Sequence, residues 1–233
     1  IGRMKRGNVI FVLLGSIFAL VCLQLGFWQL ARLSERKALN LELSARATTA
    51  PVPLSELPAD TGAAHFRRVL VSGAYDFDHE IYVTNRTRNG SPGVQVITPL
   101  RVAGNDTAVL ITRGWVYAPD GMTIERKRWK EPDTLSGEAF VVYYVHQDGT
   151  PKLAGRNRSY RWLDERALSQ DFPYPIASYH LILISGGAKA GPNVPPRLEV
   201  PPLDEGPHQS YAIQWFSFAT ISIIGMFLFV RRK

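Results

Sequence analysis

The sequence predicts two transmembrane α-helices, one near each end of the chain, flanking a mainly antiparallel β domain, barrel-like or an open sheet, with a short helix. Residues 9–28 and 211–230 are uncharged apolar runs. Each is long enough to span a bilayer, because about twenty helical residues cover roughly 30 Å. Between them, short β-branched and aromatic stretches alternate with turn residues, the pattern of an antiparallel sheet or small barrel.

Composition and charge exclude several functional classes. The 233 residues are 45% hydrophobic and 20% charged, which allows one domain of ordinary size beside the membrane segments. The net charge is +7, but most of the excess lies in Arg3, Lys5, Arg6 and residues 231–233. It is therefore a topology signal, and we expect no nucleic-acid partner. The single cysteine, Cys22, excludes an intrachain disulfide and a Cys-x-x-Cys site.

The N-terminal third is predicted to be mostly helical. Residues 1–8 form a cytoplasmic N-terminus and residues 9–30 the first transmembrane helix. Its apolar core is longer than that of a signal peptide and no small-x-small cleavage site follows, so we expect an uncleaved anchor. Residues 31–64 are predicted to be a helical extension, rich in helix formers, followed by a connecting loop.

The segment 65–185 is predicted to be an extracytoplasmic β-rich domain. The expected strands are 68–75, 80–84, 93–102, 108–116, 137–147 and 179–185, with a short helix at 163–170. The turn Gly104-Asn105-Asp106 predicts a hairpin, on which Arg113-Gly114-Trp115 is expected to be structural. In that motif we expect Trp115 to bury its ring against the sheet and Gly114 to allow close approach of the backbone. His180, in an apolar strand, is interpreted as a hydrogen-bonded structural histidine.

The C-terminal segments return the chain to the membrane. Residues 186–207 form a Gly/Pro-rich linker, residues 208–230 the second transmembrane helix and residues 231–233 a cytoplasmic C-terminus. Acidic residues precede this span and basic residues follow it, which favours a cytoplasmic C-terminus. With two spans, the N-terminus is then cytoplasmic and the main domain lies outside.

Polar residues within the two spans leave alternatives open. Gln24, Gln29 and Gln214 either hydrogen-bond between the helices or face a polar interface or another subunit.

The β domain contains no recognisable catalytic motif. The sequence lacks G-x-S-x-G, H-E-x-x-H, a Walker loop and G-x-G-x-x-G, so we do not expect an enzyme. Arg86, Arg88 and Arg113 could form an anion-binding patch, since arginine forks match carboxylates. Surface ion pairing, for example with Asp76 or Glu80, is the favoured alternative.

The start of the second span carries the sharpest candidate site. Helical spacing puts His208, Tyr211 and Trp215 on one stripe. A neutral imidazole ligates haem iron, and flat aromatic rings pack against a porphyrin. Trp28 and Arg32 lie at the matching end of the first helix, where Arg32 could meet a propionate. The alternative is an interfacial aromatic belt with a histidine near the lipid headgroups.

Blocks of sequence in a fixed order extend this interpretation. They are Leu25–Arg32 (LGFWQLAR), Gly73 to Arg86, Thr98 to Val116 with its LITRGWV, and His208–Phe216 (HQSYAIQWF). Together they resemble the Surfeit locus protein one family, the cytochrome c oxidase assembly factors. The resemblance implies a two-span protein with a periplasmic or intermembrane-space domain. It also implies a role in forming the haem a site of the oxidase catalytic subunit, with the family histidine at His208.

Partners and location follow from the resemblance as expectations. We expect the protein to bind haem a transiently and to contact the catalytic subunit of cytochrome c oxidase and the lipid bilayer, with the haem a synthesis machinery as a further candidate partner. The short N-terminus lacks a mitochondrial transit sequence, so a bacterial inner membrane is expected. The competing functions are a structural accessory protein of the oxidase that does not touch haem and an extracytoplasmic enzyme on a membrane tether, which the missing catalytic motifs disfavour.

Overall fold

The computed structural model describes the chain except for residues 1–5, 59, 145, 188–190, 199–202 and 232–233. The chain divides into two units. The helical unit combines residues 1–44 with 202–233, and the sheet unit comprises residues 45–201.

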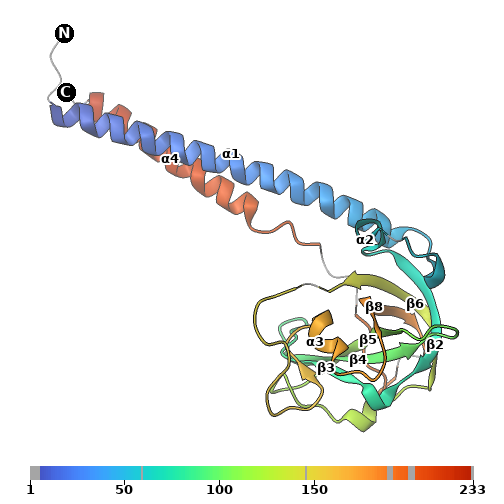
Figure 1. Cartoon of the computed structure of the whole chain (residues 1–233). Helices are drawn as coiled ribbons and strands as arrows, with labels where there is room; N and C mark the ends of the chain where they lie inside the picture. The colour runs from blue at the N-terminus through green and yellow to red at the C-terminus, as the bar shows by residue number, and fades with distance from the viewer. Residues whose placement is uncertain (1–5, 59, 145, 188–190, 199–202, 232–233) are drawn as a thin grey trace. The chain divides into compact units, whose positions relative to one another are not determined.

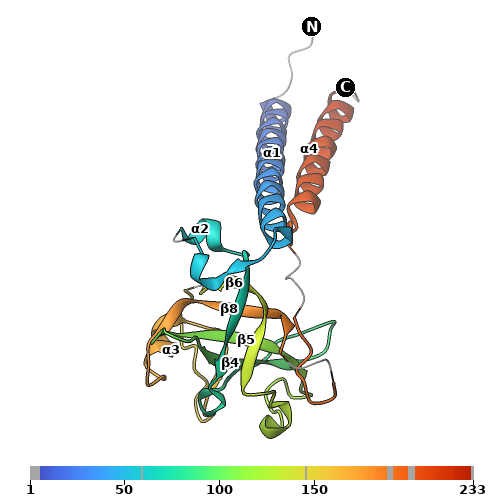
Figure 2. The ribbon, with the colours of Figure 1, turned by 90° about the vertical axis from the view of Figure 1, so that its right-hand side faces the viewer.

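Two long helices make up the helical unit. They are α1 (Arg6–Thr48) and α4 (His208–Arg231), which lie side by side in Figures 1 and 2. Both are long and apolar enough to cross a membrane, which indicates a membrane-anchored protein. Because the residues after the apolar run of α1 are good helix formers without Gly or Pro, the helix continues unbroken to Thr48.

Small residues let α1 and α4 approach closely. A Cβ atom added to Gly15 would lie 2.6 Å from Met226 Sδ, and one added to Gly26 would lie 2.6 Å from the Phe216 ring. Further small side chains are buried in the helices: Ala19, Cys22, Ala212 and Ala219. This is the usual way in which membrane helices pack, since lipid supplies no hydrophobic drive for their association.

The sheet unit contains one mixed sheet. Its strands are β1 (Val52–Pro53), β2 (Arg68–Tyr75), β3 (Ile81–Val83), β4 (Gly93–Arg101), β5 (Ala108–Tyr117), β6 (Thr134–Tyr143), β7 (Ser159–Tyr160) and β8 (Ile176–Gly186). The short helices are α2 (Thr61–Ala64) and α3 (Glu165–Ser169), and the 3₁₀ turns are η1 (Leu54–Glu56), η2 (Phe77–His79) and η3 (Arg126–Trp129).

The sheet order is β1-β2-β6-β8-β5-β4-β3-β7. Since β2 also pairs with β4, the strands β2, β6, β8, β5 and β4 form a closed series of pairings. Among the described strands, β1–β2, β3–β7 and β5–β8 pair in parallel and the other pairs are antiparallel. The predicted fold class is therefore confirmed, including the hairpin of β4 and β5.

The core lies on both faces of β5, whose residues from Ala108 to Gly114 are all buried. One cluster of buried side chains includes Val69, Leu100 and Ile111. Leu168 of α3 belongs to a second cluster with Leu110. Burial on both faces explains why the first half of this strand, residues 108–111, is a continuous apolar run in the sequence.

Candidate functional site

His208 is the first residue of α4, and a tight turn leads the chain into it. Asp204 Oδ1 accepts a hydrogen bond from the Gly206 amide at 2.8 Å, and Gly206 adopts a φ of 72° that favours glycine. Tyr211 N donates to Pro207 O at 3.1 Å, which forms the first turn. His208 is thus fixed at the helix start and remains half-buried.

The His208 ring is held by a residue of α1. Its Nδ1 atom lies 2.8 Å from Gln29 Oε1, and Gln29 is buried. Because an amide oxygen accepts, we assign the hydrogen to Nδ1, which leaves a lone pair on Nε2. This is the tautomer and support that metal-ligating histidines commonly have. Of the glutamines expected to join the helices, Gln29 does so, whereas Gln24 and Gln214 are exposed.

The other predicted site residues are less closely associated. Tyr211 and Trp28 are 46% and 52% exposed, and the Trp215 ring packs edge-on to Phe218 at 5.9 Å. Arg32 Nη1 binds Glu35 Oε2 at 2.7 Å. In the described residues, no hydrogen bond or ring contact joins Trp28 or Arg32 to the stripe of His208, Tyr211 and Trp215.

A hollow of about 330 Å³ lies along α1 beside Trp28. It is lined by Val21, Gln24, Leu25 and Trp28, which helical spacing puts on one face. The lining of the hollow is mostly apolar and contains none of His208, Tyr211 and Trp215. An apolar surface and a histidine with a free Nε2 are both chemically compatible with haem. The sequence pattern indicated Gln29 as a candidate for a hydrogen bond between the helices but did not identify His208 as its partner.

Arg113 lies in a different environment from the predicted one. Its side chain is fully buried, and it donates to Thr98 Oγ1 at 2.8 Å, Glu131 Oε1 at 2.9 Å and Glu80 Oε2 at 2.5 Å. Arg113 is therefore not available for an anion-binding patch with Arg86 and Arg88, which was the less favoured interpretation of the sequence. Glu80 is the partner that the alternative named, but the ion pair is buried.

The same cluster includes Arg197, which forms a two-pronged contact with Glu131 at 2.9 and 2.6 Å. Burial alone would raise the pKa of Glu131, but the hydrogen bonds and charges of Arg197 and Arg113 lower it overall. Arg197 also donates to Arg113 O at 2.7 Å. Because two guanidinium groups face two carboxylates, the cluster is neutral and stabilises the fold rather than binding a ligand.

The remaining structural expectations are met in part. A Cβ atom on Gly114 would lie 2.4 Å from Pro196 O, so the close backbone approach is confirmed. Trp115 is half-buried rather than in the core: its ring lies against Gly93 and its Nε1–H donates to Arg86 O at 2.7 Å.

His180 is structural but lacks the expected hydrogen bond. Its Nδ1 atom is buried without a partner in the described residues, and its ring lies 5.4 Å from that of Tyr144. Burial lowers the pKa of His180 to about 4. In the described part of the chain, no three His, Cys, Asp or Glu residues form a metal-binding group.

Known proteins share extended sequence similarity with this chain. The SURF1 family model matches residues 16–220. The SURF1-like protein of Monosiga brevicollis is 28% identical over 98% of this chain and 90% of its own length. Surfeit locus protein 1 of Xenopus tropicalis is 30% identical over 55% of this chain and 45% of its own length. Cytochrome oxidase assembly protein SHY1 of Saccharomyces cerevisiae is 31% identical over 52% of this chain and 33% of its own length. Since the family model covers most of the sequence and extends into both apolar helices, this chain belongs to the SURF1 family.

Proposed function

We propose that this protein is a membrane-anchored assembly factor for aa3-type cytochrome c oxidase. It assists formation of the haem a site in the catalytic subunit of the oxidase. The name of the yeast relative, a cytochrome oxidase assembly protein, supports the oxidase as partner. The two apolar helices support anchoring in the membrane, and the assembly-factor names support a non-catalytic role.

The protein acts by binding haem a transiently through His208. The observation that carries this proposal is the 2.8 Å hydrogen bond between His208 Nδ1 and Gln29 Oε1. This contact orients the ring and leaves Nε2 with a free lone pair, so His208 would hold the haem iron, and the bound haem would supply the redox-active iron that the oxidase needs. Trp28, Tyr211 and Trp215 would shield the porphyrin face of the bound haem from water.

Release of the haem is as important as its capture. A single histidine on a half-exposed surface holds haem less tightly than a buried pair of ligands would. Arg32 is bound to Glu35 on the surface and has to exchange this partner before it can meet a propionate. Surface ion pairs contribute little stability, so this exchange is inexpensive.

The proposed location is a bacterial inner membrane, with both termini cytoplasmic and the sheet unit periplasmic. The acidic pair Asp204-Glu205 before α4 and Arg231 at its end support this topology, whereas Arg232 and Lys233 lie outside the described residues. Alkaline phosphatase fused after Lys233 is expected to be inactive, and a fusion in the 118–121 turn is expected to be active. The reverse pattern contradicts the topology.

A second candidate function is a structural accessory protein of the oxidase that does not touch haem. It is favoured by the exposure of Trp28 and Tyr211 and by the pairing of Arg32, which are typical of an interfacial belt. The absorbance spectrum of detergent-purified protein from cells that make haem a separates the two functions.

The decisive variants alter the ligand and its support. His208→Ala is expected to remove the haem a spectrum without lowering the membrane level of the protein. Gln29→Leu removes the support of the ring and is expected to weaken haem binding by about 10–100-fold. His180→Ala serves as the control, because it is expected to lower stability while the surviving protein binds haem. A wild-type spectrum in His208→Ala rules out His208 as the ligand and favours the accessory function.

Deletion of the gene tests the role in assembly. Active aa3-type oxidase is expected to fall while haem a is still made. Membranes that lack haem a altogether point to a biosynthetic role instead.

A further inference from the structure

A polar pocket of about 270 Å³ lies in the sheet unit. Its lining comes from η2, the start of β3, β7 and the loops on either side of β7: His79, Ile81, Lys152, Asn157, Arg158, Tyr160, Asp171 and Phe172. Ile81 and Phe172 supply a buried apolar wall, and the other side chains are polar. None of these residues belongs to the Arg113 cluster or to the helical unit.

Arg158 lines the pocket and has an unfavourable backbone conformation. Its φ is 60°, in the left-handed region that non-glycine residues rarely adopt. Strained residues are concentrated at functional sites, where the surrounding structure holds them in place. In the described residues the half-buried Arg158 guanidinium makes no hydrogen bond or ion pair. A glycine would satisfy the backbone here, so the side chain itself is what distinguishes this position.

The one carboxylate in the pocket is already neutralised. Asp171 Oδ1 binds Lys152 Nζ at 2.5 Å, and Asp171 Oδ2 accepts a hydrogen bond from the Tyr160 hydroxyl. Burial alone would raise the pKa of Asp171, but Lys152 and Tyr160 lower it below its ordinary value. Asp171 therefore balances Lys152, and the charge of Arg158 stays uncompensated.

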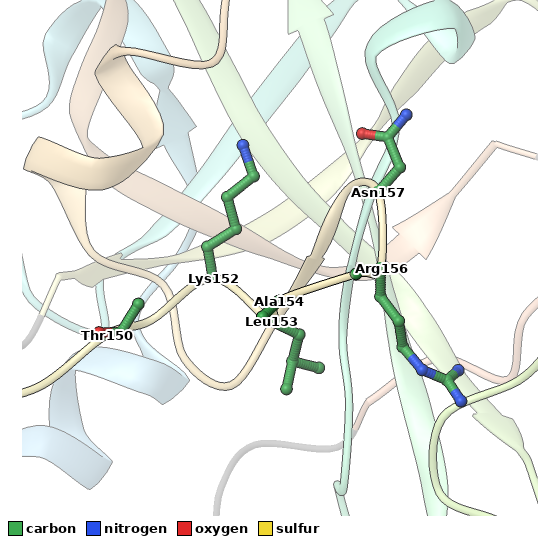
Figure 3. A pocket seen from close by; sticks show the side chains of 7 residues that line it. Thr150, Lys152, Leu153, Ala154, Arg156 and Asn157 are labelled. Carbon is green, nitrogen blue, oxygen red and sulfur yellow. The ribbon is translucent and has the colours of Figure 1, made fainter.

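Further polar groups are positioned at the same pocket. His79 Nδ1 lies 2.8 Å from Asp76 Oδ2, which also accepts from Tyr174 OH at 2.7 Å, so the imidazole is fixed in orientation. Figure 3 shows the adjoining hollow along residues 150–157, where Lys152 and Asn157 project to the same side of the loop and Arg156 to the other. The Asn157 side chain makes no hydrogen bond in the described part of the chain.

We propose that this pocket binds a small oxyanion, a phosphate or carboxylate group, through the Arg158 guanidinium and the Asn157 amide. The planar fork of arginine matches both anions, and the volume is near the lower limit of small-molecule sites. The apolar wall of Ile81 and Phe172 accommodates a short hydrocarbon part of the ligand. The anion comes either from a free small molecule or from an anionic lipid headgroup.

Isothermal titration calorimetry on the detergent-purified full chain tests this site, with inorganic phosphate, succinate and dihexanoyl-phosphatidate as probes. Arg158→Gln is expected to weaken binding about tenfold or more, because it removes a charged donor. The matched control is Arg166→Gln on the exposed face of α3, outside the pocket, which is expected to bind like the wild type. Binding of phosphate or succinate identifies a free anion as the source, and binding of dihexanoyl-phosphatidate alone identifies a lipid headgroup.

A second variant separates loss of the site from loss of the fold. Arg158→Gly removes the guanidinium but suits the backbone φ of 60°, so it is expected to raise the melting temperature while weakening anion binding. Undiminished binding in Arg158→Gly overturns the proposal. So does a lack of binding with all probes, or equal weakening by Arg158→Gln and Arg166→Gln.

Discussion

Replacing Arg113 by methionine tests whether the buried ion cluster stabilises the sheet unit. The methionine side chain matches the apolar stem of arginine and lacks the guanidinium group, so the change removes the charge and leaves much of the volume. Arg113 is fully buried and donates to Thr98, Glu131 and Glu80. Removing one partner of a buried ion pair typically costs about 3–5 kcal/mol, because the other charge is left uncompensated.

The structure indicates where in this range the cost lies. Glu131 keeps its two-pronged contact with Arg197, so it remains paired after the substitution. Glu80 keeps hydrogen bonds from Tyr82 OH at 2.5 Å and Thr98 Oγ1 at 2.6 Å but has no other cationic partner in the described residues. We therefore expect a loss of about 3 kcal/mol, or roughly 6–12 °C in Tm for a unit of this size.

Thermal unfolding of the detergent-purified protein, followed by tryptophan fluorescence, measures this loss. Arg166→Met, on the exposed face of α3, is the matched control and is expected to change Tm little. Adding Glu80→Gln to Arg113→Met removes the isolated charge and is expected to recover part of the stability. An Arg113→Met protein that melts within about 2 °C of the control refutes the argument, because buried charges would then be compensated in another way.

Further predictions concern backbone contact, pH and strain. Gly114→Ala places a methyl group against Pro196 O and is expected to cost about 1–3 kcal/mol, measured as a lower Tm; an unchanged Tm means that the 191–198 segment moves aside freely. Because burial lowers the pKa of His180 to about 4 in the folded protein, the unfolded chain takes up this proton first as pH falls below 6.5. Stability is therefore expected to fall from pH 6.5 to pH 4 by at most about 3 kcal/mol, and His180→Leu is expected to lack that slope in melting curves. Arg158→Gly is expected to raise stability by about 1 kcal/mol, since the left-handed conformation is unfavourable for arginine; a lower Tm contradicts the assignment of strain.

The parts of the fold that sequence patterns predicted are those with strong local signals. The strands β2, β4, β5 and β8 follow from β-branched runs and turns, and the two apolar helices follow from length and composition. The two-residue strands β1 and β7 lie in segments for which the sequence predicted no strand. They are strands because their backbones hydrogen-bond to β2 and β3. Their own residues show no strand pattern that would have predicted this.

The candidate sites divide in the same way. Helical spacing placed His208 and its aromatic stripe at the start of α4, but the contact with Gln29 joins residues 179 positions apart. Arg113 looked like a surface cation because charged residues usually are exposed. Its burial depends on Glu131, from a segment expected to be a charged loop, and on the packing of β4 against β5. Such contacts are properties of the tertiary structure, so one sequence without its fold does not reveal them.

The degree to which polar groups are satisfied distinguishes structural sites from binding sites in this protein. The Arg113 cluster uses its donors internally, and a fully satisfied buried network has no capacity left for a ligand. His208 hydrogen-bonds to Gln29 through one ring nitrogen, and its other ring nitrogen makes no hydrogen bond in the described residues. The Arg158 guanidinium also makes none there, and the Arg158 backbone is strained. Half-buried groups of this kind gain more from a ligand than exposed ones, because water already satisfies the latter. On this criterion, substitutions at His208 and Arg158, which lie in separate units, are expected to weaken ligand binding more than they lower stability. Substitutions at Arg113 are expected to lower stability and to have little direct effect on ligand binding.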